Sequence, residues 1–518
     1  MTRRFKGTVL VGLLLLVSLP YVLGYALAGA EWVFGGFLLN PIDGQSYLAK
    51  MFQGWQGAWR FTLPYTHEPG QGAYIFLYYL ALGHLARLVG LPLALVYHLA
   101  RLVGAAVLAS GVMALYEETL PPAAHKTAVV LGLFGAGLGW LVVFFELLPA
   151  DVWVAEMYPF LSAYTNPHFP LGLGLLLWML VLVVRAARAE TGSLLARGLL
   201  LSGLGVLLAG VQPFGIVVLA VVLGGWLAWE WAAARRLPWR AISVAAAALG
   251  PGGAYLLYQY AAILADPVLA GWNAQNFTPA PPAWDFVLSL SPALLLAGVA
   301  AWRAWRSKMT TRGVRLLLVW ALGGLVLAYL PFPLQRRFLL GYFVPLAGLA
   351  AVGLAALQQR WPGRAHALGR LALGLALPTN AIVLLIGLFG ILSHAPELYL
   401  TRDEAAVLGW LNAQSAPGGV VLASPEMGLY VPGHSGRRVI YGHPFETVNA
   451  ASEEQAVLAV YSGVVRGPNL ERFLGERGVD WILYGARERA LGGAPAFLDY
   501  PVVFQSGADR VYAVHELP

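Results

Sequence analysis

The sequence predicts a polytopic α-helical membrane protein of about eleven spans, with a small α/β domain at its C-terminal end. Apolar runs of roughly 18 or more residues recur along most of the 518-residue chain, and each is long enough to cross a hydrocarbon core of about 30 Å. Only 11% of the residues are charged, whereas a soluble protein would have about a quarter, and the mean hydropathy is +0.67. Short basic loops separate the apolar runs, as in multi-span proteins.

The first apolar run, Thr8 to Leu27, follows the basic start MTRRFK. A secretory signal peptide starts in a similar way, but this run is longer than a usual signal core. We therefore interpret the run as a retained first span, with the N-terminus inside and, after an odd number of spans, the C-terminus outside.

The spans are predicted from the apolar runs and the charges between them. They lie near 8–28, 93–117, 127–149, 168–185, 196–212, 214–232, 241–263, 286–302, 315–332, 338–358 and 371–392. The basic loops 185–197, 234–240, 303–315 and 360–370 then all face the cytoplasm, together with the loop 118–126. The net charge of +7 thus belongs to cytoplasmic loops and is not a nucleic-acid signal. Counting 73–91 as a twelfth span would move the later basic loops outside, so we predict a helix on the outer face there.

Polar residues collect in the loops of the predicted outer side. The first outer segment runs from about residue 29 to residue 92, and the others are 151–170, 211–215, 265–285 and 331–338. A polar turn at Gln212-Pro213 follows a short, glycine-rich run, and irregular backbone at membrane depth is tolerated where it lines a cavity. These loops together indicate a cavity that opens to the outer side.

The composition changes near Glu397, so we divide the chain into a transmembrane domain (1–395) and an extracytoplasmic α/β domain (396–518). Helices are expected over 402–415, 451–465 and 469–478, and strands over 418–425, 436–442, 479–485 and a closing hairpin at 501–517. The loop 439–449, with His443 and Glu446, could cover the cavity or could be an ordinary loop.

Asp43 lies at the start of a predicted helix in the first outer segment. The segment NPID (40–43) fits a helix start, with Asn40 as N-cap, Pro41 as the first helical residue and the acid at the third position. This helix would place Asp43, Tyr47 and Lys50 on one face. A partly desolvated carboxylate is a suitable general base for a hydroxyl or amine, so we predict Asp43 as catalytic and the other two as substrate-binding. A capping role is compatible, because a cap holds the carboxylate in place.

Arg336 and Arg337 lie between two spans on the predicted outer side, where arginine is unusual. They could extend toward lipid headgroups. The guanidinium fork also suits a phosphate or pyrophosphate, and ionisable groups near a membrane cavity are functional by default. We predict that at least one of the two binds phosphate.

Other polar residues of the outer loops are weaker candidates. Those that could bind substrate or serve as loop residues and caps are His67, Glu68, Asn166, His168, Gln212 and His443. Asp151 and Glu156 are two acids in one outer loop and are weak candidates for a metal site, without a convincing ligand set. The chain has no cysteine, which excludes thiol catalysis. It has no usefully placed P-loop, dinucleotide or zinc-protease motif, which argues against a cytosolic nucleotide-driven enzyme.

The pattern resembles the GT-C superfamily of membrane glycosyltransferases, and within it the bacterial branch related to protein mannosyltransferases and aminoarabinose transferases. In NPIDGQSYLAK (40–50), Asp43 stands where that family has an acid soon after the first span. In the stretch 67–104, which begins HEPGQG, the residues His67, Glu68 and Arg101 occupy family-like positions. QRRFLLGYFVPLAGLAAVGL (335–354) resembles the family's arginine-led span. The sequence departs from the family pattern at two places. Gly44 stands where the family often has a second acid, and His-Glu-Pro-Gly (67–70) stands where the family usually has a lysine or histidine before a Pro-Pro pair.

The resemblance implies inverting transfer of a sugar from a polyprenyl-phosphate donor on the outer face of a bacterial inner or plasma membrane. Asp43 would deprotonate an acceptor hydroxyl or amine of a glycan, lipid or protein, and Arg336 or Arg337 would stabilise the departing phosphate. Arg101 joins the predicted substrate-binding residues. A divalent metal ion stays open as a cofactor, and no nucleic-acid partner is expected. Aromatic residues near Trp55 could stack on sugar or lie at the membrane interface.

Other functions fit parts of the sequence. A transporter or flippase for a lipid-linked glycan would also span the membrane, but no convincing internal repeat supports alternating access, and the C-terminal domain is left unexplained. A polymerase or ligase of lipid-linked glycans is a close enzymatic alternative. A non-catalytic assembly protein predicts no concentration of polar groups around Asp43.

Overall fold

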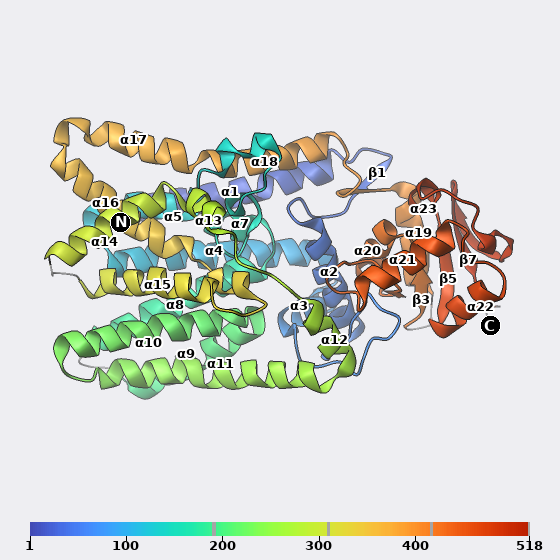
Figure 1. Ribbon diagram of the computed structural model, residues 1–518, viewed down its shortest axis with the longest axis horizontal. Helices are drawn as coiled ribbons and strands as arrows, with labels where there is room; N and C mark the ends of the chain where they lie inside the picture. The colour runs from blue at the N-terminus through green and yellow to red at the C-terminus, as the bar shows by residue number, and fades with distance from the viewer. Residues whose placement is uncertain (189–192, 308–310, 415–417, 516–518) are drawn as a thin grey trace. The chain divides into compact units, whose positions relative to one another are not determined.

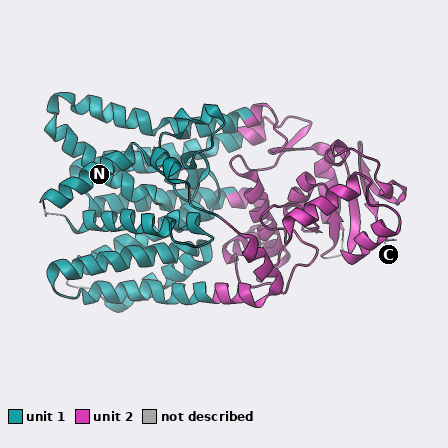
Figure 2. Ribbon diagram, viewed as in Figure 1, with its two compact units in different colours: residues 1–22, 98–257, 278–389 teal, residues 23–97, 258–277, 390–518 magenta. Residues whose placement is uncertain are grey.

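The computed structural model describes residues 1–188, 193–307, 311–414 and 418–515 (Figure 1). The chain divides into two compact units (Figure 2). Unit 1 comprises Met1–Val22, His98–Leu257 and Thr278–Phe389, and unit 2 comprises Leu23–Tyr97, Tyr258–Phe277 and Gly390–Pro518. Each unit is therefore assembled from segments that lie far apart in the sequence.

Unit 1 is a bundle of helices (Figure 1). Its helices are α1 (Arg3–Ala26), α4 (Leu93–Thr119), α5 (His125–Phe134), α6 (Ala150–Trp153), α7 (Pro159–Tyr164), α8 (His168–Arg188), α9 (Leu194–Val211), α10 (Phe214–Ala234), α11 (Trp239–Ala265), α13 (Ala283–Leu290), α14 (Ala293–Ser307), α15 (Arg312–Ala328), α16 (Phe343–Arg360), α17 (Ala365–Ala376) and α18 (Pro378–Leu392). Short 3-10 helices are η1 (Pro122–Ala124), η2 (Gly139–Leu141), η3 (Val143–Phe145), η4 (Gln335–Leu339) and η5 (Pro362–Arg364). Helices α1, α4, α11 and α18 also have residues in unit 2.

Seven helical stretches in the described residues are long and apolar enough to cross a membrane, or eight if α13 and α14, which meet at a bend of 85°, form one span. They are Arg3–Ala26, Leu93–Thr119, His168–Arg188, Leu194–Val211, Phe214–Ala234, Trp239–Ala265 and Pro362–Leu392. Large apolar side chains such as Leu15, Leu199 and Phe389 are exposed on these helices, as lipid contact requires. The chain is therefore a membrane protein, and the full count of eleven spans stays a prediction. The run 73–91, not counted as a span, contains the 13-residue helix α3 (Leu77–Val89).

The continuous span predicted over 127–149 is wrong. Helix α5 ends at Phe134, and residues 135–149 form irregular backbone with only the short turns η2 and η3. The backbone amides of Gly137 and Gly139 point instead to the carboxylate of Asp151, each at 3.0 Å from Oδ2. Hydrophobicity alone did not reveal the break, because these donors are satisfied by a side chain beyond the run.

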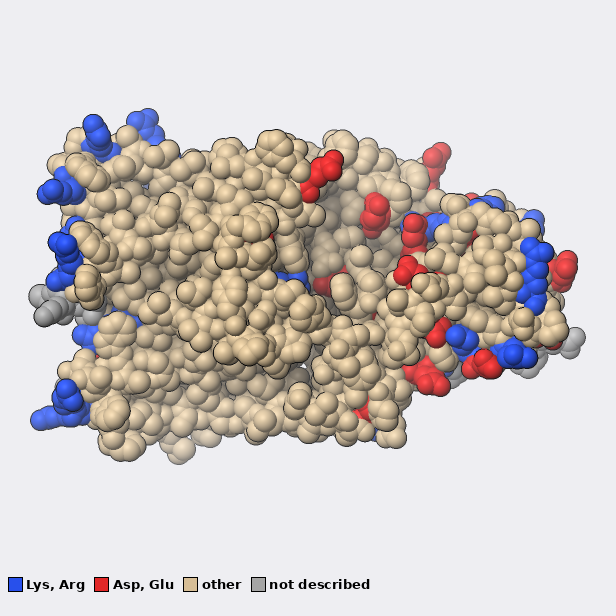
Figure 3. Space-filling model, in the orientation of Figure 1, with Lys and Arg blue, Asp and Glu red and all other residues tan. Residues whose placement is uncertain are grey.

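On the face shown in Figure 3, many basic side chains of unit 1 gather at one end of its bundle, at the adjoining ends of α10 and α11, of α14 and α15, and of α16 and α17. These ends belong to the basic segments that the sequence assigns to the cytoplasmic side. Their clustering at one end of unit 1 is the arrangement that the positive-inside rule requires.

Unit 2 combines the first outer segment with the C-terminal part of the chain. Its helices are α2 (Pro41–Gln56), α3, α12 (Pro267–Gln275), α19 (Arg402–Ala413), α20 (Pro425–Ser435), α21 (Ala450–Tyr461), α22 (Pro468–Glu476) and α23 (Ala486–Ala490), with the 3-10 helix η6 (Ala496–Asp499). Its strands are β1 (Trp32–Phe34), β2 (Tyr399–Thr401), β3 (Val420–Leu422), β4 (Arg438–Val439), β5 (Val479–Tyr484), β6 (Val502–Ser506) and β7 (Asp509–Ala513).

The C-terminal strands form one mixed sheet in the order β4-β3-β5-β7-β6. Strand β3 pairs in parallel with β4 and β5, and β7 pairs antiparallel with β5 and β6. Val421 faces α19 and α20, whereas Val420 and Leu422 face α21 and α22, because successive side chains of a strand point to opposite faces. Each expected strand contains an observed one, but α20 was missed by the sequence analysis.

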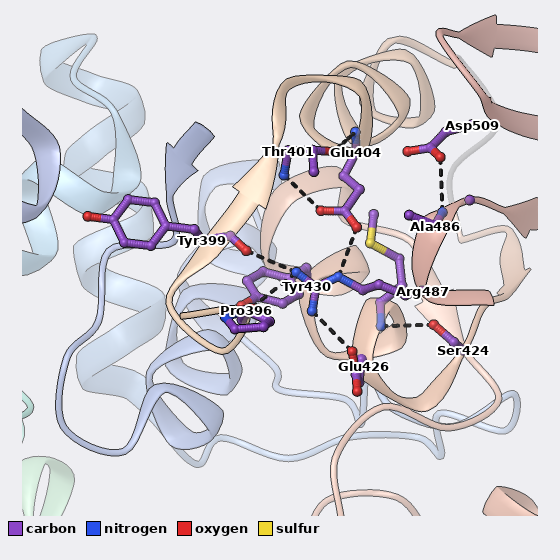
Figure 4. A network of polar contacts seen from close by, with 12 residues as sticks. Pro396, Tyr399, Thr401, Glu404, Ser424, Glu426, Tyr430, Ala486, Arg487 and Asp509 are labelled. Carbon is purple, nitrogen blue, oxygen red and sulfur yellow. Dashed lines mark hydrogen bonds and ion pairs between the residues drawn. The ribbon is translucent and has the colours of Figure 1, made fainter. Parts of the chain in front are cut away.

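The first outer segment is joined to the C-terminal part by the small sheet of β1 and β2, in which Trp32 pairs with Thr401. A polar network around Arg487 holds β2 and α19 (Figure 4). The Arg487 guanidinium donates to Glu404 Oε1 at 2.9 Å and to the Tyr399 carbonyl at 2.9 Å. The N-terminal part of unit 2 therefore comes from residues that the sequence assigns to the transmembrane domain. The predicted domain boundary near residue 395 lies close to Gly390, where the chain enters unit 2 for the last time.

Candidate functional site

Helix α2 begins as the sequence predicts. Asn40 is the N-cap, with a left-handed backbone at φ 55°, and its side chain accepts the Asp43 amide N–H at 3.4 Å. Asn40 Nδ2 also donates to Asp43 Oδ2 at 2.6 Å. The cap therefore fixes the Asp43 carboxylate, whose side chain is 29% exposed, at the first turn of the helix.

The loop 442–447 lies against the same face of α2 and brings a histidine to Asp43. His443 Nε2 lies 3.5 Å from Asp43 Oδ1. The other ring nitrogen, Nδ1, accepts the backbone N–H groups of Phe445 and Glu446, at 3.1 and 3.2 Å. Because Nδ1 accepts, we infer that the ring proton is on Nε2, facing Asp43. The loop thus holds the imidazole with Nε2 toward the Asp43 carboxylate.

Two helical turns after Asp43, Lys50 is buried and forms an ion pair with Glu446. Its Nζ lies 2.6 Å from Glu446 Oε1 and 2.8 Å from Ser46 Oγ, and Ser46 Oγ also donates to the same carboxylate at 2.7 Å. Lys50 Nζ lies over the rings of Tyr47 and Phe76, at 5.0 and 4.7 Å from the centroids. Asp43, Tyr47 and Lys50 therefore share one face of α2, as predicted.

Electrostatics within this group, here called the α2 site (Asp43, Ser46, Lys50, His443 and Glu446), set the protonation of its members. Burial acts to raise the pKa of Glu446, but Lys50 and His443 more than offset this, so the pKa is lowered. Burial, with the charges of Glu446 and Asp43, raises the pKa of the neighbouring Tyr65. Glu446 is thus ionised and Tyr65 keeps its proton at neutral pH.

Two polar atoms of the α2 site are buried and have no hydrogen-bond partner among the described residues. They are His443 Nε2, whose contact with Asp43 lacks hydrogen-bond geometry, and Glu446 Oε2. Buried polar atoms in proteins are otherwise nearly all satisfied. Both atoms therefore mark a place where a polar ligand would gain hydrogen bonds.

The remaining candidates of unit 2 have other partners. His67 accepts at its carbonyl from Arg438, and burial lowers the pKa of its ring. The Glu68 amide donates to Thr66 Oγ1 at 3.3 Å. Tyr47 stacks on Tyr79 with ring centroids 4.4 Å apart. No contact of His67 or Glu68 with the α2 site is found in the described residues, so their substrate-binding role stays a prediction.

In unit 1, Arg336 and Arg337 of η4 share the carboxylate of Glu156. Arg336 Nε lies 3.2 Å and Arg337 Nη1 lies 3.7 Å from Glu156 Oε1, and the Arg336 guanidinium lies 4.6 Å from the Trp153 ring centroid. The Arg336 amide also donates to the Thr278 carbonyl at 3.0 Å. Two guanidinium groups and one carboxylate sum to a charge of +1, which favours an anion at this position.

The suggested metal pair of Asp151 and Glu156 is not supported by their contacts. Asp151 is fully buried, and its carboxylate accepts Thr379 Oγ1 at 2.9 Å and Ser289 Oγ at 3.2 Å besides the two glycine amides. Glu156 is paired with the η4 arginines. No group of three or more His, Asp or Glu able to hold a metal ion occurs among the described residues. Burial raises the pKa of Asp151 to about 6.

The other predicted residues of unit 1 are buried. Arg101 Nη1 donates to the carbonyls of Val17 and Ala163, both at 2.9 Å, and thereby ties α4 to α1 and α7. Asn166 and His168 are buried at the start of α8, and Gln212 caps the C-terminal end of α9. Their contacts are structural, and their predicted role in substrate binding stays a prediction.

The structure also contains contacts that the sequence analysis missed. Ser46 lies three residues after Asp43, so helical spacing alone could have added it to the face. Gln45 Oε1 lies 3.1 Å from His434 Nε2, which fixes α2 against α20. Nothing local predicts this pair, because α20 contains Pro432 and two glycines, which are typical of turns, and the partners are 389 residues apart.

No protein-family model matches the chain, and no curated protein is significantly similar to it in sequence. Solved structures do match. The oligosaccharyltransferase of Archaeoglobus fulgidus, tethered to an acceptor peptide, has a TM-score of 0.58 at 12% identity over 93% of this chain and 69% of that one. ArnT from Cupriavidus metallidurans bound to undecaprenyl phosphate has a TM-score of 0.50 at 14% identity, over 96% of this chain and 97% of that one. The arabinofuranosyltransferase AftD from Mycobacteria has a TM-score of 0.56 at 14% identity, over 99% of this chain and 40% of that one.

The chain has the GT-C fold. This confirms the resemblance stated from the first outer segment and the arginine-led helix. The likeness covers 96% of this chain in the ArnT comparison, so residues of both units contribute to the GT-C fold. At 12–14% identity the comparisons establish the fold, and the assignment of chemistry rests on the residues of the site.

Proposed function

We propose that this GT-C protein is a glycosyltransferase that moves a sugar from a polyprenyl-phosphate donor to an acceptor hydroxyl or amine on the outer face of the membrane. Structures of the same fold include an oligosaccharyltransferase, an arabinofuranosyltransferase and ArnT bound to undecaprenyl phosphate. The observation that carries the proposal is the α2 site, where a capped, partly exposed carboxylate faces His443 beside two buried polar atoms without partners.

Asp43 is the proposed general base. Its carboxylate is reachable, unlike the buried Glu446 and Glu156, which pair with Lys50 and the η4 arginines. Asn40 Nδ2 donates a hydrogen bond to it and His443 Nε2 lies 3.5 Å away, so the carboxylate is held in place. Such preorganisation is what a proton transfer from a bound acceptor needs. His443 acts through Asp43 and is a positioning residue.

The proposed transfer is one displacement. Asp43 accepts the proton of the acceptor hydroxyl or amine, and the acceptor atom forms a bond to the anomeric carbon. The bond from that carbon to the phosphate oxygen breaks, and its electron pair leaves with the polyprenyl phosphate. Attack opposite the leaving group inverts the anomeric carbon. Arg336 and Arg337 are the proposed partners of the phosphate, whose growing charge their guanidinium groups would stabilise.

No step is assigned to a metal ion, because the described acids are otherwise engaged. Asp151 is bound by four hydrogen-bond donors and Glu156 by two arginines. A divalent ion would have to be held by the donor's phosphate together with residues outside these contacts. Dependence on a divalent cation therefore stays an open prediction that a chelator titration would answer.

The test is the exchange Asp43→Asn, which keeps shape and removes the base. We expect the purified protein in detergent to release polyprenyl phosphate from at least one member of a panel of polyprenyl-phosphate sugars when acceptor is present. Asp43→Asn should lower the rate by about 10²–10⁴-fold, the usual contribution of a general base. The matched control Glu31→Gln removes an exposed acid of the same unit and should leave the rate unchanged.

Full activity of Asp43→Asn would remove the proposed base. A wild-type protein that carries labelled donor across liposome membranes, without releasing polyprenyl phosphate, would instead establish the transporter alternative.

A further inference from the structure

A cavity of about 370 Å³ lies in unit 1, and the η4 arginines are not among the residues that line it. It is enclosed by the end of α4, the end of α8, the facing ends of α14 and α15, and one side of α16. Its volume is within the range of about 300–1,000 Å³ that is common for ligand pockets. The residues named below all belong to unit 1, so the cavity does not depend on how the two units are placed.

The walls and the mouth of this cavity differ in chemistry. Apolar side chains form most of the wall, and they are Leu120, Pro121, Ala300, Ala304, Val314, Val352 and Ala356. The polar lining includes Glu118, Arg188 and Arg303. An apolar interior with cations at its rim fits an amphipathic anion, whose carbon chain enters and whose charge stays at the mouth.

The charge balance at the mouth favours an anion. Glu118 is already paired with two arginines, Arg188 and, at 3.0 Å, Arg185. Arg303 is exposed and has no ion-pair partner among the described residues. Counting these four side chains, three cations meet one carboxylate, which leaves a charge of +2 for a ligand to neutralise.

The position of the cavity identifies the source of that ligand. Its lining residues lie at the helix ends where basic side chains of unit 1 gather (Figure 3), on the side that the sequence assigns to the cytoplasm. The cytoplasmic leaflet supplies anionic phospholipids, and basic pockets between membrane helices on that side bind their headgroups. A soluble phosphate would satisfy the arginines but would leave the apolar wall without a partner.

We propose that this cavity binds an anionic glycerophospholipid, with its phosphate at Arg303 and Arg188 and the adjoining part of an acyl chain against α14 and α16. The site is separate from the proposed glycosyl transfer and does not rest on it. Its occupant would join α4, α8, α14 and α16 at one end of unit 1.

The experiment measures lipid retention by native mass spectrometry of the full-length protein in detergent, titrated with phosphatidylglycerol or phosphatidylcholine. We expect the wild type to retain phosphatidylglycerol in preference to phosphatidylcholine. Arg303→Ala should weaken this retention about fivefold, the contribution of one arginine near an anionic lipid. Ala304→Phe, which fills the cavity and keeps the charges, should also weaken it.

The matched control is Arg306→Ala, because Arg306 is an exposed cation of the same helix that lies over Trp302 and does not line the cavity. It should retain phosphatidylglycerol like the wild type. Equal loss in Arg306→Ala, equal retention of the two lipids, or unchanged retention in both cavity variants would overturn the proposal. Inorganic phosphate that competes as well as the lipid would also overturn it, since the acyl chain would then contribute nothing.

Discussion

The buried ion pair between Lys50 and Glu446 gives the sharpest prediction for stability. The pair joins α2 to the loop 442–447, and its side chains are 0% and 12% exposed. Lys50→Met keeps an unbranched apolar stem among Tyr47 and Phe76 but removes the ammonium group. Glu446 would then be a buried carboxylate that keeps a hydrogen bond from Ser46 Oγ. Breaking a buried pair from one side is costly because the other charge stays in place.

The expected cost of Lys50→Met is about 3–5 kcal/mol at neutral pH. For a unit of roughly 200 residues, each kcal/mol shifts Tm by about 2–4 °C, so the loss should be roughly 6–20 °C. The double variant Lys50→Met/Glu446→Gln removes both charges and should be more stable than Lys50→Met, because replacing a whole buried pair is often nearly neutral. The control Lys6→Met breaks a pair with Glu117 that is 38% and 27% exposed, and it should cost about 1 kcal/mol or less.

The pH dependence has a definite sign. The pKa of Glu446 is lowered from its ordinary value of 4.5 in the wild type, so the pair's stabilisation is present above pH 4.5 and is lost as the pH falls through the folded pKa. In Lys50→Met, the ammonium charge no longer opposes the effect of burial, so the pKa of Glu446 in the folded protein should rise. The variant should then gain stability as the pH falls, and its deficit relative to the wild type should shrink between pH 8 and pH 4.

The assay is thermal unfolding in detergent, followed by intrinsic tryptophan fluorescence across this pH range. A Tm for Lys50→Met within 2 °C of the wild type at pH 8 would refute the reasoning. So would a deficit that stays constant with pH, because it would show that the loss comes from packing and not from an unpaired carboxylate.

Two further predictions concern unit 1. Arg336→Ala and Arg337→Ala should each weaken binding of undecaprenyl phosphate, measured by native mass spectrometry, while the exposed Arg364→Ala should not; unchanged binding in both would retire the phosphate role of η4. Asp151→Asn should remove a pH-dependent part of stability: the folded pKa of about 6 exceeds the ordinary 3.8, so this part is present at low pH and is lost as the pH rises through 6. Wild type and Asp151→Asn should therefore differ in the pH slope of Tm between pH 4 and pH 7, and equal slopes would contradict the assignment.

Local chemistry made the start of α2 predictable. Asn40 and Pro41 fix the first turn, and the spacing of Asp43, Tyr47 and Lys50 fixes their common face, whatever the rest of the chain does. The strands of the C-terminal sheet were recognisable for a similar reason, because short apolar runs between turn residues report burial directly. The same local reasoning failed at 135–149, where an apolar run is not helical because Asp151 binds its free amides.

The partners in the site were not predictable from spacing. Ser46 and Glu446 are 400 residues apart, and nothing near either residue indicates the other. Helix α20 was not predicted, because Pro432, Gly428 and Gly433 are residues that disfavour a helix. In the structure, the two glycines allow close contact with the backbone of Tyr441 and Gln45. Glu156 is only a weak candidate for a metal site on sequence grounds, and nothing near it in the sequence indicates the η4 arginines that lie beside it.

The sequence by itself determined that this is a membrane protein with basic loops, a capped acid after its first apolar helix and an α/β region at its end. These features follow from composition, periodicity and capping, which act over a few residues. Only the tertiary structure decided which charges meet: His443 with Asp43, Glu446 with Lys50, and Glu156 with Arg336 and Arg337. The reason is physical, because a buried charge is stable only beside a partner, and the folding of distant segments chooses that partner.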